Sequence, residues 1–187
     1  IIPKNSILNI QIKLVSLTAL FDIPATQSLE INEYINDTAL NDTSVWSGND
    51  GFVYRSSSSR LVMKVLDSSF LVSPVEGNTV SLSYVLYDLN DSSAVIDRRT
   101  VVDPFLFTLG VDEIMPGLDE AVRNMHLNEP TLILLTSDIA YQESAAVLPN
   151  YEGLRQALVV AQVIPTYAAA IEPFQILRFE ASIEKID

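Results

Sequence analysis

Cysteine is absent from the 187 residues of this chain, and histidine occurs only once. These residues therefore supply no disulfide bond, no reactive thiol and no cysteine-based metal site. Basic residues are scarce, because 11 lysines and arginines stand against 24 aspartates and glutamates, which gives a formal net charge of −13. The phosphates of a nucleic acid would be repelled by this charge, so we expect no nucleic-acid partner. No apolar run approaches the length of a membrane span, and we expect no transmembrane segment in this chain.

The short motifs that mark many cofactor and metal sites are also missing. There is no phosphate-binding loop, no G-x-G-x-x-G and no G-x-S-x-G, and the acidic residues lack the spacing of a calcium loop. The single histidine, His126, follows a predicted helix and is interpreted as a solvated loop residue. We therefore expect neither a cofactor nor a bound metal.

The clearest local pattern runs from residue 104 to residue 141. Residues 104–109 predict a short strand that ends in a glycine turn, and residues 131–136 predict an apolar strand. Pro116 suits the start of a helix between them, where its missing N–H costs nothing. The apolar residues of this helix follow the spacing i, i+3, i+4, i+7: Leu118, Ala121, Val122 and Met125.

Five short motifs in this order resemble the FK506-binding-protein (FKBP) family of peptidyl-prolyl isomerases. The motifs are Val80-Ser-Leu-Ser-Tyr84, Ile96-Asp97, the P-F-L-F-T-L-G that starts at Pro104, the E-I-M-P-G-L-D-E-A-V that starts at Glu113, and Ser137-Asp-Ile-Ala-Tyr141. The resemblance continues through Ile164-Pro165 to a last strand at about residues 177–183. It implies an α+β fold in which a bent antiparallel β-sheet wraps over one short α-helix.

The resemblance assigns residues 74–187 to an FKBP-like domain with one addition. Residues 151–160 carry apolar side chains at helical spacing, which predicts a helix inserted in the loop before the last strand. We expect Leu154 and Leu158 of this helix to face the domain.

The residues before position 74 are predicted to form two further segments. Residues 1–17 are interpreted as the last strand of a preceding FKBP-like repeat, because Ile2-Pro3 and Ile7-Leu8 match Ile164-Pro165 and Ile176-Leu177. The alternative for this segment is an unrelated amphipathic strand. Residues 18–73 are interpreted as a connector that contains a helix, with Ser28 as its cap and Leu29 on its apolar face, and a pair of strands at residues 51–54 and 61–66.

The implied reaction needs no nucleophile and no general acid or base. Rotation about an X-Pro bond passes through a twisted amide that has lost its resonance and is less polar than the planar form. A dry apolar cavity therefore favours the transition state over the ground state. The expected partner is a proline-containing polypeptide.

By resemblance, the site residues fall into a catalytic and a substrate-binding group. The catalytic residues are Tyr84, Asp97, Phe105 and Tyr141. The substrate-binding residues are Ile96, Ile114, Met115, Leu118, Ile164 and Phe179. In this assignment Tyr141 donates its hydroxyl to the substrate carbonyl, the backbone at residues 114–115 holds the peptide, and Asp97 is a buried polar group that orients the site. The alternative is structural: the aromatic residues belong to the core, and Asp97 forms a surface ion pair with Arg98 or Arg99.

Three positions depart from the family pattern. Ile96 stands where the family usually has Phe, Leu118 where it usually has Trp, and Gln142 where it usually has Gly. The first two changes remove aromatic surface from the pocket, so we expect an isomerase of reduced activity. The alternative is an FKBP-fold binding module with little or no catalysis, such as a chaperone or a subunit of a cell-envelope complex. The resemblance is to the extracytoplasmic members of the family, which predicts a chain that acts on exported proteins in the periplasm or at the outer-membrane surface of a gram-negative bacterium, as a lipoprotein or a periplasmic protein.

Overall fold

The computed structural model describes residues 22–37, 53–65, 72–89, 91, 93–112, 114–141, 152–163 and 171–187. The predicted strand of residues 1–17 and the substrate-binding residue Ile164 lie outside these ranges. The described strands are β1 (Val53–Arg55), β2 (Leu61–Val65), β3 (Thr79–Asp88), β4 (Val95–Arg99), β5 (Phe105–Thr108), β6 (Thr131–Leu135) and β7 (Leu177–Ile186). The described helices are α1 (Ile23–Asn36), α3 (Pro116–Arg123), the 3-10 turn η2 (Ser137–Ile139) and α4 (Glu152–Val160).

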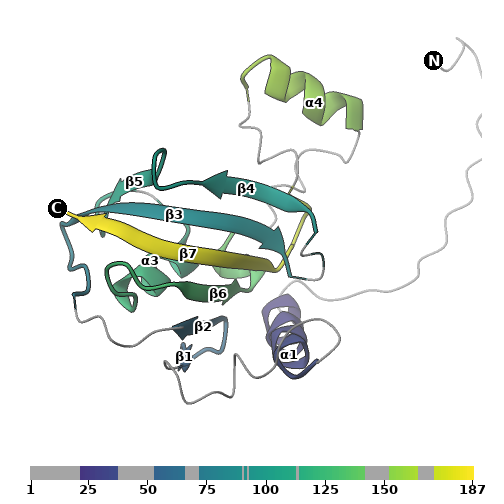
Figure 1. Cartoon of the computed structure of the whole chain (residues 1–187). Coiled ribbons are helices and arrows are strands. Elements are labelled where there is room, and N and C mark those ends of the chain that lie inside the picture. Colours follow the sequence, from purple (N-terminus) through teal and green to yellow (C-terminus); the bar gives the residue numbers. More distant parts are fainter. Residues whose placement is uncertain are drawn as a thin grey trace, which may run out of the picture.

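The strands form one seven-stranded antiparallel sheet in the order β1-β2-β6-β7-β3-β4, and β5 pairs with the other half of β3 (Figure 1). Together with its short helices, this sheet confirms the α+β fold class predicted from the sequence. The predicted strand pair around residues 51–66 corresponds to β1 and β2. Because β2 pairs with β6 along its whole length, this pair extends the sheet of the FKBP-like region.

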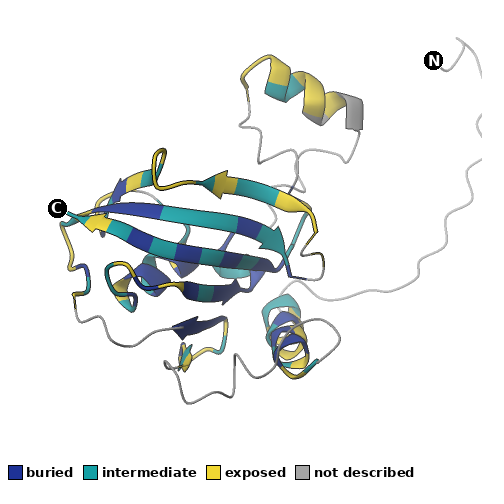
Figure 2. Cartoon of the chain, in the orientation of Figure 1, coloured by how far each residue is buried: buried dark blue, intermediate teal, exposed yellow. Residues whose placement is uncertain are grey.

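The two long strands β3 and β7 lie at the centre of the sheet and alternate between its two faces. Phe179 pairs with Leu86, and Ile183 pairs with Leu82, and all four side chains are buried on one face. Figure 2 shows the same alternation as buried and half-buried stripes along β7. Successive side chains of a strand point to opposite faces, so an apolar residue at every second position gives the sheet one buried side, here called the inner face.

Helix α3 covers the inner face. Pro116 occupies its first turn, and the buried side chains Leu118, Ala121 and Val122 pack into the main core, as their spacing predicted. Gly117 allows a close approach, because a Cβ atom there would lie 2.8 Å from Leu135 Cδ2 and 3.0 Å from the backbone oxygen of Ile139. The helix prediction for this segment is therefore confirmed.

Helix α1 covers part of the opposite, outer face. Its buried residues Ile31, Tyr34 and Ile35 form a second cluster with outer-face residues of β2 and β6, Val62 and Leu134. The helix begins at Ile23, so the prediction of Ser28 as its cap is wrong. Ser28 lies inside the helix and donates its hydroxyl to the carbonyl of Pro24 over 2.8 Å.

Two other expectations about helices are also corrected. Leu29 was predicted on the apolar face of the connector helix but is 65% exposed, because the face that packs against the sheet is that of Ile31 and Ile35. Helix α4 is confirmed at its predicted position, but Leu154 is 39% exposed and does not pack on the domain as predicted. Figure 1 shows α4 standing apart from the sheet.

His126 lies in a loop after α3, as predicted, but the prediction that it is solvated is wrong. The ring of His126 is only 22% exposed, and its Nδ1 lies 2.6 Å from Oε2 of Glu129, whose side chain is fully buried. Glu129 is buried because the chain from α3 folds back across the end of the sheet, where Leu127 bridges to Ile183. His126 thus provides a polar partner for the buried carboxyl group of Glu129.

Candidate functional site

A cavity of about 260 Å³ opens on the inner face, between the start of α3 and strands β3, β4, β5 and β7. Its lining consists of Tyr84, Asp97, Arg99, Phe105, Ile114, Met115, Leu118, Tyr141 and Phe179. Eight of the ten residues predicted from the sequence are therefore brought together around one cavity. Ile96 does not line it and is half-buried against the main core. Ile164 belongs to a part of the chain that the structure does not describe.

Three aromatic rings from three strands form one wall of the cavity. Tyr84 of β3 meets Phe179 of β7 at a centroid distance of 5.4 Å and Phe105 of β5 at 6.4 Å, both nearly edge to face. Phe105 also stacks on Phe107 at 5.3 Å. Edge-to-face rings are favourable beyond their buried area, so the Tyr84 ring is held by its neighbours on both sides.

The opposite wall is the start of α3. Leu118 is 2% exposed and lies in the first turn of the helix, where it lines the cavity. The carbonyl of Met115 accepts hydrogen bonds from the backbone N–H groups of Leu118 (3.0 Å) and Asp119 (3.1 Å). Residues Ile114 and Met115 are therefore fixed at the cavity by the helix that follows them.

A polar pair sits within this apolar lining. The Tyr84 hydroxyl donates to Oδ2 of Asp97 over 2.7 Å. Burial raises the pKa of Tyr84 well above its ordinary value, and the hydrogen bond to Asp97 raises it further, whereas a hydrogen bond with Arg99 has a smaller effect in the opposite direction. Tyr84 is therefore neutral at physiological pH, and its hydroxyl is engaged by the carboxylate.

Arg99 is a lining residue that the sequence reasoning did not assign to the site. It pairs directly with Tyr84 in the β3–β4 register, and its Nη1 lies 3.4 Å from Oδ2 of Asp103. The signal for it was present, because Asp97 and Arg99 are two positions apart in a strand and share a face. From the sequence, Arg99 is predicted only as a possible ion-pair partner of Asp97.

Tyr141 reaches the cavity from a tight turn after β6. The turn η2 ends with Ala140, whose backbone N–H donates to the carbonyl of Ser137 over 3.1 Å. Asp138 of the same turn forms an ion pair with Arg60 at 2.7 Å. These contacts anchor the turn to the β1–β2 hairpin just before Tyr141.

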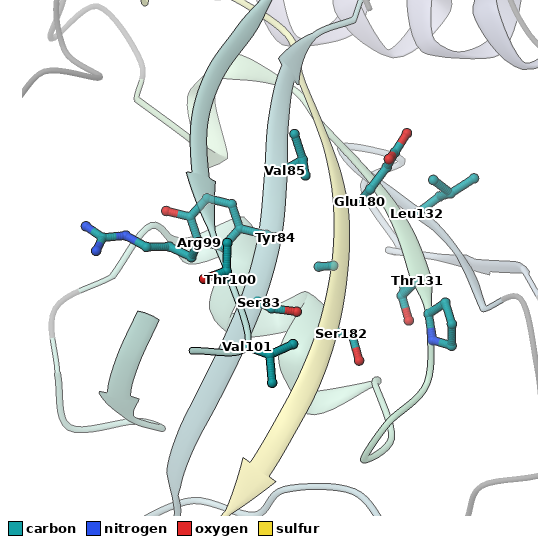
Figure 3. A pocket seen from close by; sticks show the side chains of 12 residues that line it. Ser83, Tyr84, Val85, Arg99, Thr100, Val101, Thr131, Leu132, Glu180 and Ser182 are labelled. Atoms are coloured by element: carbon teal, nitrogen blue, oxygen red, sulfur yellow. The ribbon is translucent and has the colours of Figure 1, made fainter. Parts of the chain in front are cut away.

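The outer face carries a wider but shallower hollow of about 570 Å³ (Figure 3). Its lining includes small polar side chains of β3 and β7, among them Ser83 and Ser182, with Val101 at the rim. Tyr84 is its one aromatic lining residue. Because this hollow is more open to solvent than the inner cavity, it leaves water against a bound amide, so the inner cavity is the better environment for rotation of an X-Pro bond.

Neither a metal site nor a membrane-crossing helix is found in the described ranges. These ranges contain no group of three or more histidine and acidic side chains that could hold a metal ion. None of their helices has the length and apolar character needed to cross a membrane. What the inner cavity can offer a ligand is a largely apolar enclosure that also contains the Tyr84–Asp97 pair and Arg99.

Comparison with known proteins shows the family of this chain. The sequence profile described as FKBP-type peptidyl-prolyl cis-trans isomerase matches residues 72–180, which is more than half of the chain. A search of curated proteins gives no significant sequence match.

Solved structures of similar fold include the following three. A peptidyl-prolyl cis-trans isomerase from Pseudomonas syringae is 16% identical, with a TM-score of 0.57, over 92% of this chain and 98% of that one. FkpA from Escherichia coli is 17% identical, with a TM-score of 0.56, over 88% of this chain and 59% of that one. The three FKBP domains of wheat FKBP73 are 18% identical, with a TM-score of 0.56, over 73% of this chain and 51% of that one. The matched profile and the shared fold confirm the resemblance seen in the sequence, and the chain belongs to the FKBP-type peptidyl-prolyl cis-trans isomerases.

Proposed function

We propose that the inner cavity binds the proline of a polypeptide substrate and that the X-Pro bond rotates there, more slowly than the family pattern would allow. The observation that carries this proposal is the lining itself, in which aromatic and aliphatic walls enclose the Tyr84–Asp97 pair. The planar amide loses more by leaving water than the twisted amide does, so this lining lowers the barrier.

Two hydrogen-bonding roles complete the proposed mechanism. Tyr141 donates its hydroxyl to the carbonyl of the substrate, which fixes the peptide at the cavity edge. The carbonyl of Met115 already accepts two hydrogen bonds within α3, so Ile114 is the better candidate for pairing with the peptide backbone. Tyr84 presents its ring to the proline while Asp97 holds its hydroxyl.

The proposed reduction in rate rests on Leu118. This residue replaces the usual Trp at the cavity wall, whereas Ile96, the other departure from the family pattern, does not line the cavity. One lost aromatic contact removes about 0.5–1.5 kcal/mol beyond area burial. If that contact acts in the transition state, the rate falls about two- to tenfold.

NMR exchange on a short X-Leu-Pro-Phe peptide tests this proposal. Tyr141→Phe and Asp97→Ala are each expected to lower kcat/KM about tenfold, the equivalent of one hydrogen bond. Leu118→Trp is expected to raise it about two- to tenfold. Ser182→Ala, on the outer face, is the control and should leave the rate unchanged.

Two results would contradict the proposal in different ways. Full activity of both Tyr141→Phe and Asp97→Ala would show that the inner cavity is not the site. Peptide binding without turnover, even in Leu118→Trp, would favour a binding module such as a chaperone or a subunit of a cell-envelope complex.

We also propose that the substrates are exported proteins and that the chain works in the periplasm or at the outer-membrane surface of a gram-negative bacterium. The support is the strand pair β1–β2 that precedes the matched region, which resembles many extracytoplasmic members of the family. Fractionation of cells that produce the tagged protein from its own gene tests this location. Recovery of the protein in the cytoplasmic fraction would contradict it.

A further inference from the structure

A buried amide on α1 contacts the turn that leads to Tyr141. Gln27 is 6% exposed, and its Nε2 donates to the backbone oxygen of Phe174 over 2.6 Å. Its Oε1 accepts from the backbone N–H of Ser137 at 2.8 Å and from the Ser137 hydroxyl at 2.9 Å. One side chain thus joins two parts of the chain that lie 110 and 147 residues further on.

The first partner, Ser137, is linked to Tyr141 by a short path. Ser137 is the first residue of η2, and its carbonyl accepts the backbone N–H of Ala140 over 3.1 Å. Ala140 is buried and directly precedes Tyr141. A shift of Ser137 therefore moves the residue next to Tyr141.

The second partner, Phe174, leads into β7. Its φ angle of 57° is in the left-handed region, which a phenylalanine adopts only when its surroundings hold it there. Two residues later, Ile176 packs in the α1 cluster, and β7 then carries Phe179 to the cavity wall. The Gln27 amide thus contacts the chain shortly before two of the residues that line the cavity.

We propose that Gln27 is a positioning residue of the isomerase, which holds Ser137 and Phe174 so that Tyr141 and Phe179 keep their places. This inference rests on the proposed function, because it takes the inner cavity as the site. Attachment of α1 alone does not require the amide, since Ile31, Tyr34 and Ile35 already anchor the helix. Burial of an amide is costly unless its hydrogen bonds are made, so this side chain is suited to holding backbone in place.

Gln27 lies outside the part of the chain that the family profile matches. The family profile matches residues 72–180, and α1 lies outside that region. Helix α1 would then be part of the working isomerase and not only a connector.

A double-mutant cycle between Gln27→Leu and Tyr141→Phe tests the proposal. Gln27→Leu is expected to lower kcat/KM about tenfold through misplacement of Tyr141. In that background, Tyr141→Phe should cost less than twofold further, because residues that act through one another are not additive. Ile31→Val is the matched control: it weakens α1 packing but should leave the rate and the full effect of Tyr141→Phe unchanged.

The outcomes separate this inference from the proposed function. Wild-type activity of Gln27→Leu, or full additivity with Tyr141→Phe, would overturn the positioning role. Full activity of Tyr141→Phe would remove the proposed role of Tyr141, and full activity of Asp97→Ala as well would refute the proposed site. In that case the NMR signals of the Tyr141 ring test whether Gln27 positions this residue. The positioning role is supported if Gln27→Leu shifts these signals and Ile31→Val does not, and any other result overturns it.

Gln27→Leu removes the Gln27 partner from two buried groups of Ser137 and from the half-buried carbonyl of Phe174, and could prevent folding. Ser137→Ala then replaces it, because it removes only the hydroxyl hydrogen bond to Gln27. A loss of about twofold to fivefold, again not additive with Tyr141→Phe, supports the proposal. An unchanged rate in a folded Ser137→Ala protein overturns it.

Discussion

The two faces of the sheet are built from the same central strands, yet they differ in what covers them. The inner face packs against α3 and encloses the aromatic cavity. On the outer face, α1 packs against β2 and β6 and against Leu89 and Ile176, and the open hollow with Ser83 and Ser182 lies on the same face. Alternation along β3 and β7 thus gives the sheet two different faces, and the enclosed inner cavity excludes water from a bound amide better than the open outer hollow does.

The largest expected difference between the faces concerns two neighbours on β3. Leu86 is 1% exposed on the inner face, whereas Val85 lines the outer hollow. Leu86→Ala should lower the free energy of unfolding by about 3 kcal/mol, through lost burial and the cavity that remains. Val85→Ala should cost about 1 kcal/mol or less, because its site is already open. Urea unfolding measures both, and equal losses would break the comparison.

A second prediction concerns the buried polar pair that follows α3. His126→Ala removes the contact to the fully buried Glu129. The expected loss of unfolding free energy is about 2 kcal/mol, because a buried carboxyl group is left without this partner. Glu129→Gln, which keeps a neutral acceptor, is the comparison variant and should cost less than half as much. A His126→Ala protein as stable as the wild type would show that the pair contributes nothing.

A third prediction concerns the hydrogen bond in the cavity and its dependence on pH. Tyr84→Phe should cost about 1 kcal/mol at pH 7, because Asp97 loses a donor. The raised pKa of Tyr84 means that above its ordinary value of about 10 the unfolded chain loses this proton first, so stability falls as pH rises. Below that pH the residue is protonated in both states and contributes no pH dependence.

Unfolding measured from pH 9 to pH 11.5 checks the sign. The wild type should lose stability more steeply than Tyr84→Phe across this window. Parallel curves would contradict the direction of the shift.

The smallest expected effect is on the outer face. Ser182→Ala should change the unfolding free energy by less than about 0.5 kcal/mol, as substitutions away from the core usually do. The isomerisation rate should stay within about twofold of the wild type if the inner cavity is the site. A larger loss of rate would assign the outer hollow a part in substrate binding.

Local pattern predicted most of the fold. The apolar spacing that starts at Leu118 predicted α3. The family motifs predicted eight of the residues that line the cavity, because each motif lies on an element that packs against the same cavity. The start of α1 was missed because the prediction began at Leu29 and left out Pro24 in its first turn.

Contacts between distant parts of the chain could not be predicted in the same way. Gln27 forms hydrogen bonds with Ser137 and Phe174, which are more than a hundred residues away in the sequence. The periodicity of apolar residues gives no information about such a pairing. The partnership of His126 with Glu129 depends on the burial of the carboxylate, which is decided by how the chain folds back over the sheet. The exposure of Leu154 depends on whether another element packs against α4. Helical spacing predicts the helix but not the element that covers its apolar face.

Strand β7 has one more consequence, for the order in which the protein folds. Among the described strands it comes last in the chain, yet it lies in the middle of the sheet and joins the half that holds β6 to the half that holds β3 (Figure 1). The two halves therefore remain unpaired during synthesis until β7 leaves the ribosome and inserts between them. Long-range pairings of this kind fold slowly and leave strand edges open to aggregation while they wait. The chain belongs to a family of isomerases that speed a slow bond rotation, and its own folding thus has a slow, late step.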